Sequence, residues 1–168
     1  GIDLAGQEHV EAPHPRVVYL SNAAIAADNL NTWIDQLESM DAPLIICVGP
    51  SDVVAPIAGN ALAQRRIDML AIEQNAWTLA ARDHRCMVVG TRTELDWAIK
   101  NAQICIWAPS KIVLDAVDGP SASPRDAVAL VAWFAQLMDA KELLVIGADA
   151  PQSFIPTRVK NITDTDLT

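Results

Sequence analysis

The sequence predicts an α/β fold, a three-layer α/β/α sandwich around a mainly parallel sheet. Five short apolar runs recur along the chain, and longer segments with helical periodicity separate them. Each run is almost continuously apolar, which is typical of a strand that is covered on both faces. Strands that alternate with helices in this way favour a parallel sheet with right-handed crossovers.

The five apolar runs are expected to form the strands of this sheet. They are residues 17–20, 44–48, 87–89, 104–107 and 143–146. Three of them contain or adjoin a cysteine, namely Cys47, Cys86 and Cys105. Free cysteine behaves as a small hydrophobe in such a run, so we expect reduced core residues rather than metal ligands or nucleophiles.

Helices are expected between these strands. They cover residues 28–40, 64–82, 93–101, 111–117 and 125–139. Asp28 is the expected N-cap of the first, and Thr91 or Thr93 is the expected N-cap of the third. The long second helix is expected to turn one stripe inward and to leave Asp68 on the surface. The stripe consists of Ile67, Leu70, Ala71, Trp77 and Ala81.

One domain is expected, because 168 residues of which 51% are hydrophobic can bury a single core. We expect it to span residues 16–150, with residues 151–168 as a C-terminal tail. Residues 1–15 contain two prolines and no periodicity, which indicates an extended or disordered lead-in. His9 and His14 in this lead-in are expected to be solvated rather than metal-bound.

The charge of the chain excludes some classes of partner. A formal net charge of −9 and a pI near 4.6 would repel nucleic acid and anionic membranes. The opening residues lack the basic start and apolar core of a signal peptide, and no apolar run is long enough to span a bilayer. We therefore expect a cytoplasmic protein with no nucleic-acid and no membrane partner.

The candidate ligand site lies where the strands end, because ligands of parallel α/β sheets bind outside the carboxyl ends of the strands. Ser110 and Lys111 form the most plausible anion-binding pair there, and Asp149 stands where a metal-bound phosphate could sit. Ordinary helix capping is an alternative role for Ser51 and Ser110. The candidate ligand-binding residues are Ser21, Asn22, Gly49, Ser51, Ser110, Lys111, Gly147 and Asp149.

No catalytic or metal-ligating residue is nominated. His84 is expected on the surface, and no cysteine or serine near it makes a catalytic pair. Asp68 and Glu73 are five residues apart on one helix and are therefore poorly aligned as paired carboxylates.

Four tryptophans fall on the expected helices, where they pack either in the core or at an interface. They are Trp33, Trp77, Trp97 and Trp133. Residues 127–138 are apolar on nearly every side of their helix, which favours an interface. The sequence therefore predicts a homo-oligomer or a heterodimer.

Three sequence stretches and the order of the elements carry a resemblance to a known family. The stretches are AIEQNAWTLAA at residues 71–81, IWAPS at 106–110 and AWFAQLMDAKELLVIGAD at 132–149. Over residues 16–149 the chain resembles the amino acid kinase superfamily of α/β/α sandwiches. It looks closest to the branch associated with aminomethylfuran phosphate kinase, in methanofuran and methylofuran biosynthesis. The resemblance implies phosphoryl transfer from ATP to a small acid or phosphate.

The chain departs from this family at the positions that handle phosphate. The resemblance implies a lysine and two glycines at Tyr19, Ser21 and Asn22, and a glycine triplet at residues 49–51. It implies a second lysine at Gly147, with Asp149 retained. An acidic, hydroxyl-rich segment is replaced by SASPRDA at residues 121–127, whose only acid is Asp126.

The resemblance and these departures together imply a catalytically degenerate kinase-like protein. We expect a structural or regulatory subunit in one-carbon cofactor biosynthesis, alone or beside a related kinase-like subunit, with its cofactors unknown. One alternative is an active phosphotransferase that uses ATP and Mg²⁺ and is completed by Lys111, Arg92 or a partner. The other alternative is a small-molecule or oxyanion-binding module.

Overall fold

A computed structural model describes residues 13–40, 42–52, 59–120, 126–146 and 157–159, and it confirms the α/β fold. Its sheet has six strands in the order β3-β4-β2-β1-β5-β6. The first five strands are parallel, as predicted, and β6 pairs antiparallel with β5. The strands are β1 (Arg16–Leu20), β2 (Leu44–Val48), β3 (Met87–Val89), β4 (Cys105–Trp107), β5 (Glu142–Ile146) and β6 (Thr157–Val159).

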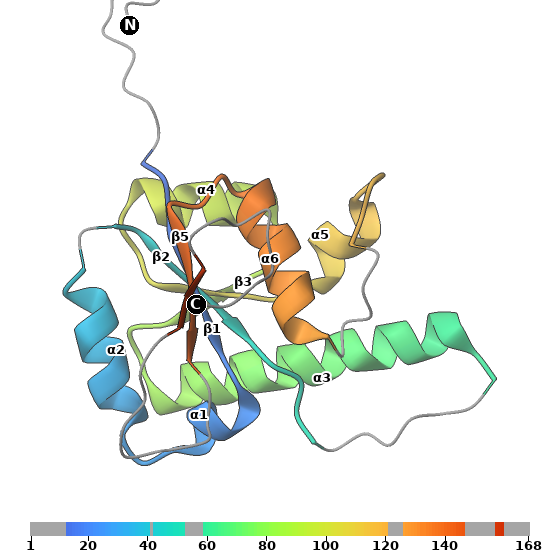
Figure 1. Cartoon of the computed structure of the whole chain (residues 1–168), viewed down its shortest axis with the longest axis horizontal. Coiled ribbons are helices and arrows are strands. Elements are labelled where there is room, and N and C mark those ends of the chain that lie inside the picture. The colour runs from blue at the N-terminus through green and yellow to red at the C-terminus, as the bar shows by residue number, and fades with distance from the viewer. Residues whose placement is uncertain (1–12, 41, 53–58, 121–125, 147–156, 160–168) are drawn as a thin grey trace, which may run out of the picture.

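Helices cover both faces of this sheet (Figure 1). The chain places α1, α2 and α3 on one side, and α4 and α6 on the other, while α5 follows the end of β4. This arrangement is the expected three-layer sandwich. The helices are α1 (Asn22–Ala26), α2 (Leu30–Glu38), α3 (Ala61–Arg82), α4 (Arg92–Lys100), α5 (Ser110–Asp115) and α6 (Ala127–Leu137).

The core lies on the two central strands. Val18 of β1 is fully buried and is in register with Ile46 on one side and Leu144 on the other. The ring of Trp107 at the end of β4 stacks on Phe134 of α6, with centroids 3.8 Å apart and planes 12° apart. Strands buried on both faces explain why the sequence runs are continuously apolar.

Each predicted helix starts one to three residues away from its predicted position, and one helix was not predicted at all. A short helix, α1, begins directly after Ser21, whose hydroxyl caps it, so α2 starts later, after Asn29 and not after Asp28. The sequence gives α1 no apolar periodicity, because five residues are too short to show one. At α4 the N-cap is Thr91, which forms a capping box with Glu94.

The predicted inward stripe of α3 is wrong, apart from Ala71. Leu70 and Trp77 are 59% and 64% exposed, whereas Asp68 is only 3% exposed. The helix instead buries Met69, Ile72, Ala76 and Leu79, and the two polar residues on the same face have hydrogen-bond partners, Asp68 with Gln64 and Asn75 with the Gly49 carbonyl. The buried residues of α3 are Asp68, Met69, Ala71, Ile72, Asn75, Ala76 and Leu79.

The cysteine prediction is confirmed, since Cys47, Cys86 and Cys105 are free and buried. Most of α6 is buried within this chain, so its apolar character does not by itself indicate a partner. Within the described part of the chain no helix is long and apolar enough to cross a membrane.

The two terminal segments differ in how far they match the prediction. The sequence predicts no strand in residues 151–168, where β6 completes the sheet. Of the two histidines of the lead-in, His14 is exposed and donates a 2.9 Å hydrogen bond from Nδ1 to the backbone oxygen of Asp139, while His9 lies outside the described residues.

Candidate functional site

The carboxyl ends of β1 and β2 bring several of the predicted site residues together. The chain runs from β1 to β2 on one side, whereas β5 lies on the other side of β1, and ligand sites of open α/β sheets lie at such a switch of direction. Ser21 directly follows β1, and its backbone N–H donates to the backbone oxygen of Ile146 at 3.3 Å. Its hydroxyl accepts from the Ala24 N–H at 3.2 Å, so the side chain is used as a cap.

A closed set of hydrogen bonds lies beside Ser21, and we call its members, Asn22, Gly49, Asp52 and Asn75, the strand-end cluster. The amide nitrogen of Asn75 donates to the Asn22 side-chain oxygen and to the Gly49 carbonyl, both at 2.9 Å. The amide nitrogen of Asn22 donates to Asp52 at 2.8 Å. The oxygen and the nitrogen of the Asn22 side chain thus each have one partner within the protein.

Ser51 is tied to α3 instead of to a ligand. Its hydroxyl donates to Gln74 Oε1 at 2.7 Å, and its N–H donates to the carbonyl of Ala71 at 3.1 Å. A bound phosphate needs free N–H groups that converge on it. The Ser51 N–H is not available in this arrangement.

Tyr19 fills the space next to Gly49. A Cβ added at Gly49 would stand 2.6 Å from the Tyr19 hydroxyl oxygen, closer than real Cβ contacts come. Burial raises the pKa of this phenol, and the charge of Asp126 raises it further. Tyr19 is therefore a neutral, packed side chain at the position where the family resemblance implies a lysine.

Ser110 and Lys111, the predicted anion-binding pair, each have a partner within the protein. The Ser110 N–H donates to Glu73 Oε1 of α3 at 3.1 Å, so a carboxylate of the protein already occupies the start of α5. Lys111 Nζ lies 2.9 Å from Asp115 on the same helix, and both side chains are exposed. The two candidate residues therefore serve separate local contacts.

Three acidic side chains lie at this edge, where the cations Arg92 and Lys111 are paired on their own helices. Asp52 belongs to the strand-end cluster, Glu73 caps α5, and Asp126 caps α6 while raising the pKa of Tyr19. Carboxylates so placed repel a phosphate. Gly147 and Asp149 lie outside the described residues, and among the residues that the structure does describe no group of three or more metal-ligating side chains gathers.

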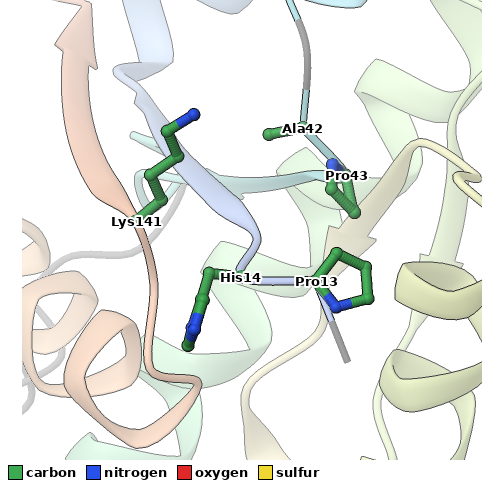
Figure 2. A pocket seen from close by; sticks show the side chains of 5 residues that line it. All are labelled: Pro13, His14, Ala42, Pro43 and Lys141. Atoms are coloured by element: carbon green, nitrogen blue, oxygen red, sulfur yellow. The ribbon is translucent and has the colours of Figure 1, made fainter. Parts of the chain in front are cut away.

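Open hollows are found at the opposite, amino-terminal edge of the sheet. One has a volume of about 420 Å³ and is lined by Pro13, His14, Ala42, Pro43 and Lys141 (Figure 2). Figure 2 shows the charged end of Lys141 and the ring of His14 pointing in different directions. A second hollow of about 470 Å³ shares its prolines. The second hollow is also lined by Glu38 and Lys100.

Three α3 residues that hold this site together were not among the predicted site residues: Glu73, which was considered only as a paired carboxylate with Asp68, and Gln74 and Asn75. Asn75 is 5% exposed and lies on the same helical face as Ile72 and Leu79. An asparagine in register with buried apolar residues is the signal that identifies it, because a buried amide needs partners.

The comparisons with known proteins add no assignment. A scan against protein-family models gives no match, and a search of the curated proteins gives none either. Any function is therefore argued from the residues of this chain.

Proposed function

We propose that this chain is a catalytically silent protein of amino acid kinase type that acts as a structural or regulatory subunit. The proposed setting is the biosynthesis of a furan-containing one-carbon carrier. The observation that carries the proposal is the strand-end cluster, in which Asn75 and Asp52 pair with the groups that would otherwise face a phosphate.

The chemistry of phosphoryl transfer makes this pairing decisive. Such enzymes work by positioning the phosphate and neutralising its charge, with little covalent chemistry from the protein. Loss of one preorganised donor typically costs about 2.7 to 4 kcal/mol of transition-state stabilisation. Here the Ser51 N–H donates to Ala71, the Ser110 N–H donates to Glu73, and Tyr19 is neutral. Several donors are thus lost at once.

The active-kinase alternative needs a cation that can reach the strand ends. Its two candidates are paired on their own helices, Lys111 with Asp115 at 2.9 Å and Arg92 with Asp96 at 3.2 Å. Both pairs are exposed, so they are weak and their breaking costs little. If the kinase alternative holds, Lys111→Ala should lose the turnover that the parent shows.

The test is an assay of purified full-length protein with Mg²⁺ and ATP, with and without an aminomethylfuran alcohol or its phosphate. We expect product at the level of the buffer blank, for the parent chain and for Lys111→Ala alike. Turnover that the parent shows and Lys111→Ala loses would establish the kinase alternative and overturn the proposal. Turnover equal in both would also overturn it if it survives repurification.

A binding module without chemistry is distinguished in the same preparation by thermal unfolding. A ligand that binds only the folded chain raises its melting temperature. We expect no rise with ATP, phosphate or aminomethylfuran phosphate, and a rise without turnover would favour the binding module.

A further inference from the structure

The outer face of α3 carries large apolar residues that are exposed in the described part of the chain. Leu62, Leu70 and Trp77 are 79%, 59% and 64% exposed. With 100° per residue they fall, together with Arg66 and Glu73, within an arc of about 80°. We call these five residues the outer stripe of α3. In Figure 1 the amino-terminal half of this helix runs outward past the strands.

The apolar surface continues onto the neighbouring helix. α3 packs against α5, and exposed apolar residues occur there at Leu114 and, just after the helix, at Val117. Most of the exposed large apolar side chains that the structure describes therefore lie on two adjoining helices. Exposed apolar residues gathered in this way mark interaction surfaces, whereas scattered ones do not.

The order of residues along the outer stripe is self-complementary. Leu62 and Trp77 are equally far from the point between residues 69 and 70, and so are Arg66 and Glu73. If two copies of α3 cross antiparallel at that point, Leu62 meets Trp77 of the second copy, and Arg66 meets Glu73 of the second copy. A two-fold axis forms each of these contacts twice, and it places Leu70 beside its own counterpart.

We propose that the outer stripe of α3 is a homodimer interface in which two copies of the helix pack antiparallel about a two-fold axis. Charge complementarity selects this occupant. A chain with a net charge of −9 is repelled by its own copy unless the contact is locally neutral, and the stripe holds one positive and one negative residue.

The two charged residues are suited to the contact. Arg66 is exposed, and no ion pair to it is found within residues 13–40, 42–52, 59–120 and 126–146. Glu73 is held in place by its Oε1, which accepts the Ser110 N–H. A carboxylate already oriented loses little side-chain freedom when an arginine meets it.

The inferred dimer deepens the proposed function, because its role as a structural or regulatory subunit rests on that function. The interface and the silent role can nevertheless be disproved separately. Sedimentation tests the interface and the phosphotransfer assay tests the silence. A monomer without turnover would remove the interface alone, and a dimer with turnover would remove the silent role alone.

The first test is sedimentation velocity of the full chain across the micromolar range. We expect the parent to be a dimer and Trp77→Glu to be a monomer, because the variant places an unpaired charge against Leu62 of the second copy at both ends of the contact, and burying such a charge is costly. Trp97→Glu is the matched control, since Trp97 is 53% exposed but lies on α4, and it should stay dimeric. A monomeric parent, or a dimeric Trp77→Glu, would overturn the proposal.

The second test is a charge exchange that depends on the antiparallel geometry. Arg66→Glu and Glu73→Arg each place like charges together twice, so each should weaken the dimer about tenfold or more. The double variant restores opposite charges and should recover dimerisation. Failure of that recovery would contradict the antiparallel pairing. Circular dichroism establishes whether each variant folds. If a variant does not fold, Leu70→Lys is used in its place, and it should weaken the dimer because it brings two like charges together at the axis.

Discussion

Asn75 donates a hydrogen bond from its side-chain amide to the backbone carbonyl of Gly49 at 2.9 Å, and this bond fastens α3 to the end of β2. The same amide nitrogen also reaches the Asn22 side chain. One buried polar residue thus joins a helix to the two central strands at the edge where a ligand would bind. The site is closed by contacts that also stabilise the fold.

Replacing Asn75 should therefore destabilise the protein. Asn75→Ala leaves the Gly49 carbonyl without its amide donor, which should lower the free energy of unfolding by about 1 to 3 kcal/mol. Urea denaturation followed by tryptophan fluorescence measures it. Asn101→Ala is the control, because Asn101 is exposed and bonds only to its own helix, at the Trp97 carbonyl. Equal losses in the two variants would argue against a role for the Asn75 contacts.

The fit between Tyr19 and Gly49 can be tested with a double-mutant cycle. Gly49→Ala should cost about 1 to 3 kcal/mol, because the new Cβ meets the Tyr19 hydroxyl 2.6 Å away. Tyr19→Phe removes that oxygen. In a protein that carries Tyr19→Phe, Gly49→Ala should therefore lower the free energy of unfolding clearly less than it does in the parent. Purely additive losses would show that the hydroxyl does not limit the space at Gly49.

Asp83, the residue that follows α3, gives the protein a defined sensitivity to acid. Its side chain is 4% exposed and pairs with Arg85 at 2.6 Å, and hydrogen bonds from Arg85 lower its pKa from 3.8 to about 2. A lowered pKa in the folded state stabilises the protein above the unfolded pKa, and this stability is lost as the pH falls from about 4 to about 2. The contribution is about 2 kcal/mol at neutral pH.

Asp83→Asn should remove that contribution at pH 7, and the difference between parent and variant should shrink as the pH falls toward 2. Thermal unfolding across this pH range measures both effects. Asp96→Asn breaks only an exposed pair with Arg92 and should change little. A constant gap between parent and Asp83→Asn at every pH would rule out the ion pair as its origin.

The three cysteines should be unreactive in the folded protein. Burial is the main cause that raises the pKa of Cys86 and of Cys105 to about 12, and burial also raises that of Cys47. The thiolate is the reactive form, so a disulfide reagent such as Ellman's should label no thiol quickly at neutral pH and all three in denaturant. A thiol that reacts quickly in the native protein would contradict the buried positions.

The fold was predictable from the sequence because the signal for a doubly covered strand is strong. The runs at residues 44–48 and 87–89 have the predicted bounds, since each is apolar throughout and ends at a polar residue or a glycine. The orientation of α3 was not predictable from apolar counts. The buried face carries Met69, Ile72, Ala76 and Leu79 at helical spacing, but it also carries Asp68 and Asn75, whose partners a count of apolar residues does not reveal.

The candidate site was predictable in position and only partly in composition. The rule that ligands bind at strand carboxyl ends placed Asn22, Gly49 and Ser51 together correctly. It could not show that Asp52, Gln74 and Asn75 would pair with them. Nor could it show that Ser110 and Lys111 would each have a carboxylate close by, Glu73 of α3 and Asp115 of α5.

The central claim is that the strand-end cluster is closed to a phosphate, and a crystal structure of the protein grown with Mg²⁺ and ATP tests it most directly. We predict that the bonds from Asn75 to Asn22 and to Gly49 persist and that this edge holds no nucleotide. A triphosphate seated against Ser21, Asn22 and Gly49, with those bonds broken, would contradict the account.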